Sequence, residues 1–169
     1  MSTFFYQVMA TPIGPMLSVT SRAGVHVLSF MEPHEEAKSL LYWEKRLQHS
    51  FRHHLDEMQA LLSQELKAYF QGTLQAFTIP LVPAGTFFQQ QVWRTLGQVV
   101  PWGKTTSYLA LAQQVGRPKA YRAVANANGA NPVCILIPCH RVIHANGGLC
   151  GYGAGLDKKC WLLQHEGWL

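Results

Sequence analysis

Residues 131–142 read Asn-Pro-Val-Cys-Ile-Leu-Ile-Pro-Cys-His-Arg-Val. The apolar and largely branched run at 133–137 is typical of a short buried strand, and Pro138 cannot continue such a strand. Cys139 follows at once, and a histidine and an arginine come directly after it. Because a neighbouring base or cation increases the thiolate fraction of a cysteine, the run predicts a nucleophilic thiol at the end of a rigid strand.

An inert, buried thiol is the usual fate of a free cysteine. A cysteine that only packs gains nothing from the polar pair His140 and Arg141 beside it. Local chemistry therefore leaves two interpretations of Cys139 open, a reactive thiol and a packing residue.

The length and composition of the chain are typical of a folded protein. The 169 residues fit one ordinary domain or two small ones, with 48% hydrophobic and 14% charged residues. No apolar run approaches the ~18 residues of a membrane span, and the first residues lack the basic start of a signal peptide. We expect a soluble, cytoplasmic protein without membrane contact, in which the cysteines are free thiols.

The charge is unevenly distributed. Residues 1–86 hold six Lys or Arg against seven Asp or Glu, whereas residues 87–169 hold eight against two. No acidic residue lies between Glu65 and Asp157. A basic half from which acids are missing is typical of a protein that binds the DNA backbone.

The first half predicts a small sheet with one helix. Strand patterns at 6–10, 16–20 and 25–30, separated by turn residues, predict an antiparallel meander. Apolar residues at helical spacing over 54–71 predict a helix that packs on the core. We expect an N-terminal domain over 1–80 and a linker over 81–86.

The second half, a domain over 87–169, predicts mostly helices. Thr86 and Gln89 have the spacing of a capping box for a helix that ends near Gly97. Two further helices are expected over 105–115 and 118–127, joined by a glycine-containing break. Helix, tight turn, helix is the helix-turn-helix pattern, although any helical hairpin resembles it.

Several short motifs occur together and in order: Pro138 to Val142, Ser107-Tyr108, Arg122 to Val124, and Trp161 to Gly167. With them, residues 86–169 resemble the O6-alkylguanine-DNA alkyltransferases, also called methylated-DNA–protein-cysteine methyltransferases. The N-terminal half resembles this family only in layout. The resemblance implies an α+β fold with a ribonuclease H-like N-terminal domain, a small antiparallel β-sheet plus helix, and a winged-helix or helix-turn-helix C-terminal domain.

The resemblance also implies a reaction. The alkyl group of O6-alkylguanine would pass from double-stranded DNA to Cys139 after the base is flipped out of the stack, and O4-alkylthymine is a possible second substrate. Sulfur suits this role, because the thioether product does not hydrolyse and the protein is consumed in a single turnover. No cofactor and no metal would be required, and we expect a monomer.

The family pattern assigns roles residue by residue. Cys139 would be the nucleophile and His140 its base, acting through a water, while Glu166 would accept the other imidazole N–H. Asn131 would brace the turn, and Tyr108 would hydrogen-bond guanine N3. Taken singly, these residues could equally be a surface histidine, a solvated acid or a core aromatic.

Further residues would form the pocket and the DNA contacts. Arg122 matches the arginine that, in the family, fills the gap left in the base stack by the flipped base. A contact to a backbone phosphate would need the same positive charge, so this second role stays open. Main-chain groups near Cys139 and Val142 would read the base edge. The pocket residues are Pro132, Val142, Tyr152 and Gly153, and the other DNA contacts are Gln89, Arg117, Lys119 and Arg141.

The chain departs from the family pattern at several positions. Tyr121 stands where a small residue is common, and Ala125-Asn126 replaces a more usual glycine pair, so the DNA-facing surface is expected to differ. Ala154 replaces a common glycine in the pocket loop. No cysteine precedes Cys134, so an N-terminal structural zinc site is not expected.

Three other functions remain open. A zinc module would use Cys134, Cys139, His140, His144 and Cys150, but residues five apart on a strand point to opposite faces and a Cys-x-x-Cys knuckle is missing. A cysteine hydrolase would use the same thiol on an acyl substrate and would not need a basic helix-turn-helix. A DNA-binding regulator without catalysis would leave Cys139 unexplained.

Overall fold

The computed structural model describes residues 2–149 and 151–169, which divide into one unit up to Ala84 and a second unit, Gly85–Leu169. None of the helices in these residues has the length and apolar character needed to cross a lipid bilayer.

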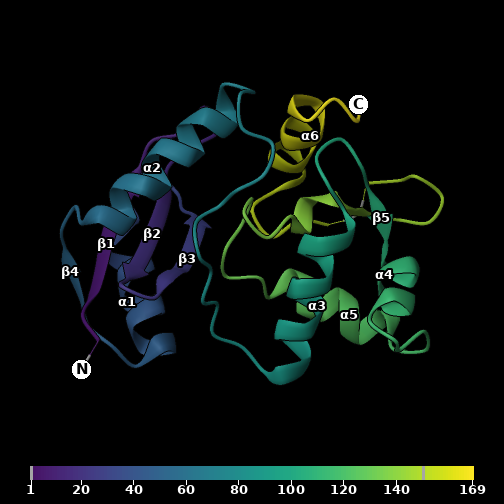
Figure 1. The fold of residues 1–169 in the computed structure, drawn as a ribbon, viewed down its shortest axis with the longest axis horizontal. Coiled ribbons are helices and arrows are strands. Elements are labelled where there is room, and N and C mark those ends of the chain that lie inside the picture. The colour runs from purple at the N-terminus through teal and green to yellow at the C-terminus, as the bar shows by residue number, and fades with distance from the viewer. Residues whose placement is uncertain (1, 150) are drawn as a thin grey trace. The chain divides into compact units, whose positions relative to one another are not determined.

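The N-terminal unit is built on a four-stranded sheet. Its first three strands, β1 (Phe4–Met9), β2 (Met16–Ser21) and β3 (Gly24–Phe30), pair antiparallel and confirm the predicted meander. A short fourth strand, β4 (Phe51–His53), pairs parallel to β1, which gives the order β3-β2-β1-β4 (Figure 1). The sheet is therefore mixed, so the expected antiparallel sheet is found for three strands and β4 departs from it. The chain returns to the β1 edge through a helix, so β4 runs in the same direction as β1.

Two helices accompany the sheet. Helix α2 (Glu57–Phe70) matches the predicted helix and begins after Asp56, whose carboxylate accepts the Gln59 N–H at 2.8 Å. Helix α1 (Glu36–Leu47), which connects β3 to β4, was not predicted.

The helices cover opposite faces of the sheet. Leu17 and Val19 of β2 share a buried cluster with Trp43 of α1. Ser18, which lies between them and points to the other face, donates to Gln59 Oε1 of α2 at 2.7 Å. Because side chains alternate between faces along a strand, one strand joins two buried layers.

The end of this unit is hydrogen-bonded to the sheet. Val25 N–H donates to the Pro80 carbonyl, and Val82 N–H donates to the Val25 carbonyl, both at 2.9 Å. The first residues of the expected linker are thus paired with β3.

The C-terminal unit is mostly helical. Helix α3 (Phe87–Val99) begins with the capping box of Thr86 and Gln89 that the sequence predicts. It packs with α4 (Tyr108–Gln114) and α5 (Tyr121–Gly129) in one cluster (Figure 1). Helices α4 and α5 begin later than expected, because Ser107 is the N-cap of α4 and residues 117–120 form a turn before α5.

Two short strands and a 3-10 turn complete the unit before its last helix. Strand β5 (Thr106–Ser107) pairs parallel to β6 (Val142–Ile143), which follows a single 3-10 turn, η1 (Cys139–Arg141). Helix α6 (Leu156–His165) ends the unit and packs against η1.

The predicted strand at 133–137 is wrong. Leu136 N–H donates to the Cys134 carbonyl at 2.9 Å, and Ile137 N–H donates to the Val133 carbonyl at 3.0 Å, so the segment is a tight turn. Ile135 has φ +72°, a region that branched residues rarely adopt. The run is buried as expected, but it folds back on itself instead of extending.

Candidate active site

The turn before Cys139 is held closed by Asn131. Its Nδ2 donates to the Ile137 carbonyl at 2.9 Å, and its Oδ1 accepts the Val133 N–H at 2.9 Å. Cys139 N–H donates to the same Ile137 carbonyl at 2.8 Å. Asn131 therefore joins both ends of the turn and holds the backbone that carries the thiol.

The Cys139 thiol is buried and acidic. A hydrogen bond from the Cys134 thiol lowers the pKa of Cys139 to about 7, against burial, which raises it. Asn131, Tyr152 and Lys159 also lower this pKa. A large fraction of Cys139 is therefore thiolate near neutral pH, although its side chain is shielded from water.

Two neighbours of this thiol stay protonated. The hydrogen bond to Cys139, together with burial, raises the pKa of Cys134 well above its ordinary value. Burial and the two thiols likewise raise the pKa of Tyr152, whose hydroxyl is buried beside them. The three groups form a cluster in which Cys139 carries the negative charge.

His140, next to Cys139, is paired with Glu166. His140 Nε2 lies 2.8 Å from Glu166 Oε1, and both side chains are fully buried. Burial would raise the pKa of Glu166, but hydrogen bonds from His140 and Arg141 outweigh it and lower this pKa to about 2. Because ionised Glu166 can only accept a hydrogen bond, the proton of the neutral His140 ring lies on Nε2.

The other imidazole nitrogen is available for proton transfer. Burial lowers the pKa of His140, so the ring is neutral at physiological pH. Its Nδ1 is buried and makes no hydrogen bond to residues 2–149 or 151–169. Nδ1 is thus the basic nitrogen of the ring.

Arg141 corrects one expectation. The family resemblance implies that Arg141 is a DNA contact, but its side chain is buried. Nε donates to Glu166 Oε2 at 2.8 Å, Nη2 donates to Glu166 Oε1 at 2.9 Å, and Nη1 donates to the Val100 carbonyl at 2.7 Å. A guanidinium committed in this way stabilises the interior and is not a surface cation.

The β5–β6 pairing sets the position of Tyr108. Ser107 lies opposite Ile143, so the residues that follow each strand lie close together. The Tyr108 ring meets the His144 ring edge to face at 6.4 Å between centroids. Tyr108 thereby lies beside the segment that follows Cys139.

Two polar residues at the site were not predicted. Lys159 is 1% exposed, and its Nζ donates to the Val142 carbonyl at 2.6 Å. Asn128 Nδ2 donates to the Cys139 carbonyl at 3.3 Å. The helical spacing of Lys159 and Leu163, with Glu166 at the C-cap of the last helix, was a usable signal, because a charge on an apolar face needs a partner.

The remaining predicted pocket residues differ in exposure. Pro132 and Val142 are buried, Tyr152 is partly exposed and Gly153 is exposed. The Val142 carbonyl accepts from Lys159, so it is already engaged as an acceptor.

The predicted DNA-contact cations lie on the surface of α5 and the turn before it. Arg117, Lys119 and Arg122 are exposed. The Arg122 guanidinium lies 5.7 Å from the Tyr121 ring centroid. The side-chain Oε1 of Gln89, in contrast, accepts the Thr86 N–H of the capping box.

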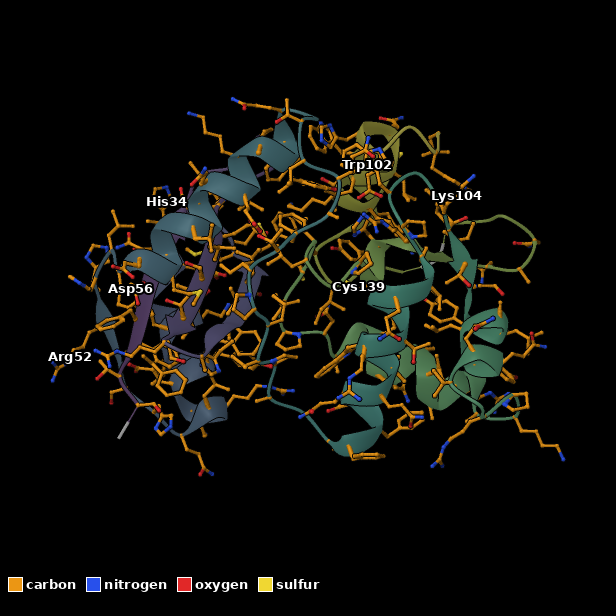
Figure 2. All side chains as sticks on the ribbon, viewed as in Figure 1. His34, Arg52, Asp56, Trp102, Lys104 and Cys139 are labelled. Atoms are coloured by element: carbon orange, nitrogen blue, oxygen red, sulfur yellow. The ribbon has the colours of Figure 1, made fainter. Side chains whose placement is uncertain are left out.

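Little negative charge opposes these cations. Glu166 is buried, so Asp157 is the exposed acid among the described residues of this unit. Figure 2 shows Lys104 directed outward and Cys139 within the unit.

Cys134 and Cys139 lie closer together than a strand would place them. The turn brings the thiols of Cys134 and Cys139 together, so the expectation that they point apart was wrong. Within residues 2–149 and 151–169, no group of three or more His, Cys, Asp or Glu side chains is placed to hold a metal ion. Cys150, which the zinc alternative included, lies outside the described residues.

Sequence comparisons identify relatives of this chain. A family model for the DNA binding domain of 6-O-methylguanine DNA methyltransferase matches residues 87–168. A methylated-DNA–protein-cysteine methyltransferase of Methanosarcina acetivorans is 40% identical over 163 residues, which cover 96% of this chain and 98% of that protein. One from Mycolicibacterium paratuberculosis is 53% identical over 103 residues, which cover 61% and 62%.

Solved structures are similar over nearly the whole chain. The O6-methylguanine methyltransferase of Mycobacterium tuberculosis matches with a TM-score of 0.80 and 37% identity, covering 97% of this chain and 93% of that chain. The same organism's OGT in complex with DNA also matches with a TM-score of 0.80 and 37% identity, covering 96% and 92%.

Proposed function

The chain belongs to the methylated-DNA–protein-cysteine methyltransferase family, and we propose that Cys139 is the residue that takes the alkyl group from O6-alkylguanine in double-stranded DNA. The family reaction is direct-reversal DNA repair by alkyl transfer to the protein itself. DNA is accordingly the partner of this chain.

One observation supports the proposal most strongly. A buried thiol with a pKa of about 7 lies next to a histidine whose Nε2 is committed to a permanent carboxylate. The His140 Nδ1 would take the thiol proton through a bridging water. The Cys139 thiolate then attacks the alkyl carbon, a carbon–sulfur bond forms, and the bond to guanine O6 breaks with its electron pair on the base.

The leaving base needs its charge offset. Tyr108, which lies beside the segment after Cys139, would donate a hydrogen bond to guanine N3 as the base leaves. Restored guanine then takes up a proton, and Cys139 is left as a thioether. Because the thioether does not hydrolyse, the alkyl group stays on Cys139 and each molecule reacts once.

The base must leave the duplex to reach a buried thiol. We assign α4, the turn at 115–120 and α5 to a helix-turn-helix of winged-helix type, with Arg122 filling the vacated stack. Arg117 and Lys119 would contact backbone phosphates. Gln89 uses its Oε1 in the capping box, so it would contact a phosphate through its side-chain NH2 group. Asp157 is the exposed acid among the residues of this unit that the structure describes, and this shortage of negative charge supports a DNA-binding surface.

Other features rest on the sequence and the family pattern. Pro132, Val142, Tyr152 and Gly153 would wall the pocket, which would also take O4-alkylthymine. The N-terminal unit, with helices on both faces of a mixed sheet, would be ribonuclease H-like. The domain division at 80–87, a monomeric state and a cytoplasmic location are part of the same proposal.

Nucleoside analysis of treated DNA tests the function. Incubation with duplex DNA containing O6-methylguanine should convert the lesion to guanine in proportion to the protein added. Cys139→Ser should abolish conversion and still bind DNA. Conversion by the serine variant, or release of free O6-methylguanine base, would show a different reaction.

A further inference from the structure

Cys139 has a second thiol beside it that alkyl transfer does not require. Cys139 lies five positions after Cys134, a separation of roughly 16 Å in an extended strand. The turn at 133–137 reverses the chain instead, and a bridge pairs Cys134 with Ile137. The Cys134 thiol consequently lies within hydrogen-bonding reach of the Cys139 sulfur.

The two thiols differ in their surroundings. Cys139 is 5% exposed, whereas Cys134 is partly exposed, and both are free. Reactive sulfur in close contact with a second thiol is the arrangement that resolves an oxidised cysteine as a disulfide.

We propose that Cys134 and Cys139 form a reversible intramolecular disulfide, which withdraws the alkyl acceptor when a peroxide is present and returns it on reduction. The effect on repair rests on the proposed function, but formation of the disulfide does not.

The chemistry proceeds in two steps. The Cys139 thiolate attacks hydrogen peroxide, which yields a sulfenic acid and hydroxide. The Cys134 sulfur then attacks the sulfenic sulfur, an S–S bond forms, and water leaves with the Cys134 proton. In sum, two thiols and one peroxide give one disulfide and two waters, and a dithiol reductant reverses the change.

The pair has a protective consequence. Without a resolving thiol, further peroxide carries a sulfenic acid to sulfinic acid, which ordinary thiols do not reduce. A disulfide stops this progression. Alkylated Cys139 has no thiol, so alkylation and disulfide formation exclude each other.

Intact-mass analysis of the full-length protein, without DNA, tests the disulfide directly. Peroxide followed by alkylation of remaining thiols under denaturing conditions should give a protein about 2 Da lighter before labelling, with two fewer labelled thiols. Peptide mapping should find Cys134 joined to Cys139, and dithiothreitol should restore both thiols.

Variants test the consequence for repair, each compared with its own untreated activity. Wild-type protein and Cys160→Ser, a matched control on α6, should recover most activity after peroxide and then dithiothreitol. Cys134→Ser should recover less than about a tenth and should carry sulfinic acid on Cys139.

A crosslink between Cys139 and Cys150 or Cys160 would overturn the inference, as would full recovery of Cys134→Ser. So would peroxide-treated wild-type protein that retains all its thiols. Failure of the untreated protein to repair DNA would count against the proposed function alone, because the crosslink is measured without DNA.

Discussion

Arg141 holds Glu166 in the protein interior through two hydrogen bonds, from Nε to Oε2 at 2.8 Å and from Nη2 to Oε1 at 2.9 Å. The same carboxylate receives His140, so one buried anion stabilises a guanidinium and orients an imidazole. Removing one partner of a buried ion pair leaves an uncompensated charge, which is far more costly than removing an exposed one.

We therefore expect Arg141→Met to lower the free energy of unfolding by roughly 3–5 kcal/mol. Arg94→Met, at an exposed position of the same unit, should change it by less than about 0.5 kcal/mol. Urea denaturation of both variants measures the difference. Equal small effects would mean that Arg141 is not held as described.

Acid stability should depend on Glu166. Its folded pKa of about 2 lies below the ordinary value of 4.5, so the carboxylate contributes stability that is present above pH 4.5 and is lost as pH falls through 2. The contribution is on the order of 3 kcal/mol. About 2 kcal/mol of it should be lost by pH 3, and comparing unfolding free energies at pH 7 and pH 3 measures this loss.

The matched control is the double variant Arg141→Met/Glu166→Gln, which removes both charges together. It should lose less stability than wild type between pH 7 and pH 3. The same acid-induced loss in both proteins would contradict this role of Glu166.

The transfer rate should follow ionisation of Cys139. With a pKa of about 7, the rate constant should rise through neutral pH, and well below it should fall about tenfold per pH unit. Cys134→Ala removes the hydrogen bond that lowers this pKa, so its profile should move to higher pH. Single-turnover rates in reducing buffer measure both profiles, with Cys160→Ser as control. An unshifted Cys134→Ala profile would show that the neighbouring thiol does not activate Cys139.

Much of this site could be predicted from short-range patterns. Cys139, His140 and Glu166 were expected together from the family motifs, and the capping box at Thr86 followed from spacing alone. The three antiparallel strands also followed, because turn residues separate clear apolar runs.

The features that could not be predicted depend on residues far away in the sequence. A branched apolar run at 133–137 looks the same as a strand, and only Asn131 and the surrounding core hold Ile135 at positive φ. Strand β4 has three residues and exists through its pairing with β1. Arg141 resembles any surface cation until Glu166 is placed beside it.

Arg122 should matter only when a base must leave the duplex. Arg122→Ala should slow repair of duplex DNA by roughly tenfold for each 1.4 kcal/mol of lost stacking, because flipping costs a few kcal/mol. Reaction with free O6-benzylguanine needs no flipping and should change little. Rates on both substrates measure the contrast.

Arg122→Lys separates the two roles of this side chain. Lysine keeps the charge but not the planar group, so it should restore little if Arg122 fills the stack. Full rescue by lysine would reduce Arg122 to a phosphate contact, and equal losses on both substrates would assign it to the fold.

The intact mass of the protein after reaction with excess methylated duplex DNA tests the central claim most directly. We predict a gain of about 14 Da, one methyl group per chain, on the peptide that contains Cys139, with no reaction afterwards. Methyl groups on Cys134, Cys150 or Cys160 instead, or repeated turnover with no gain in mass, would contradict the account.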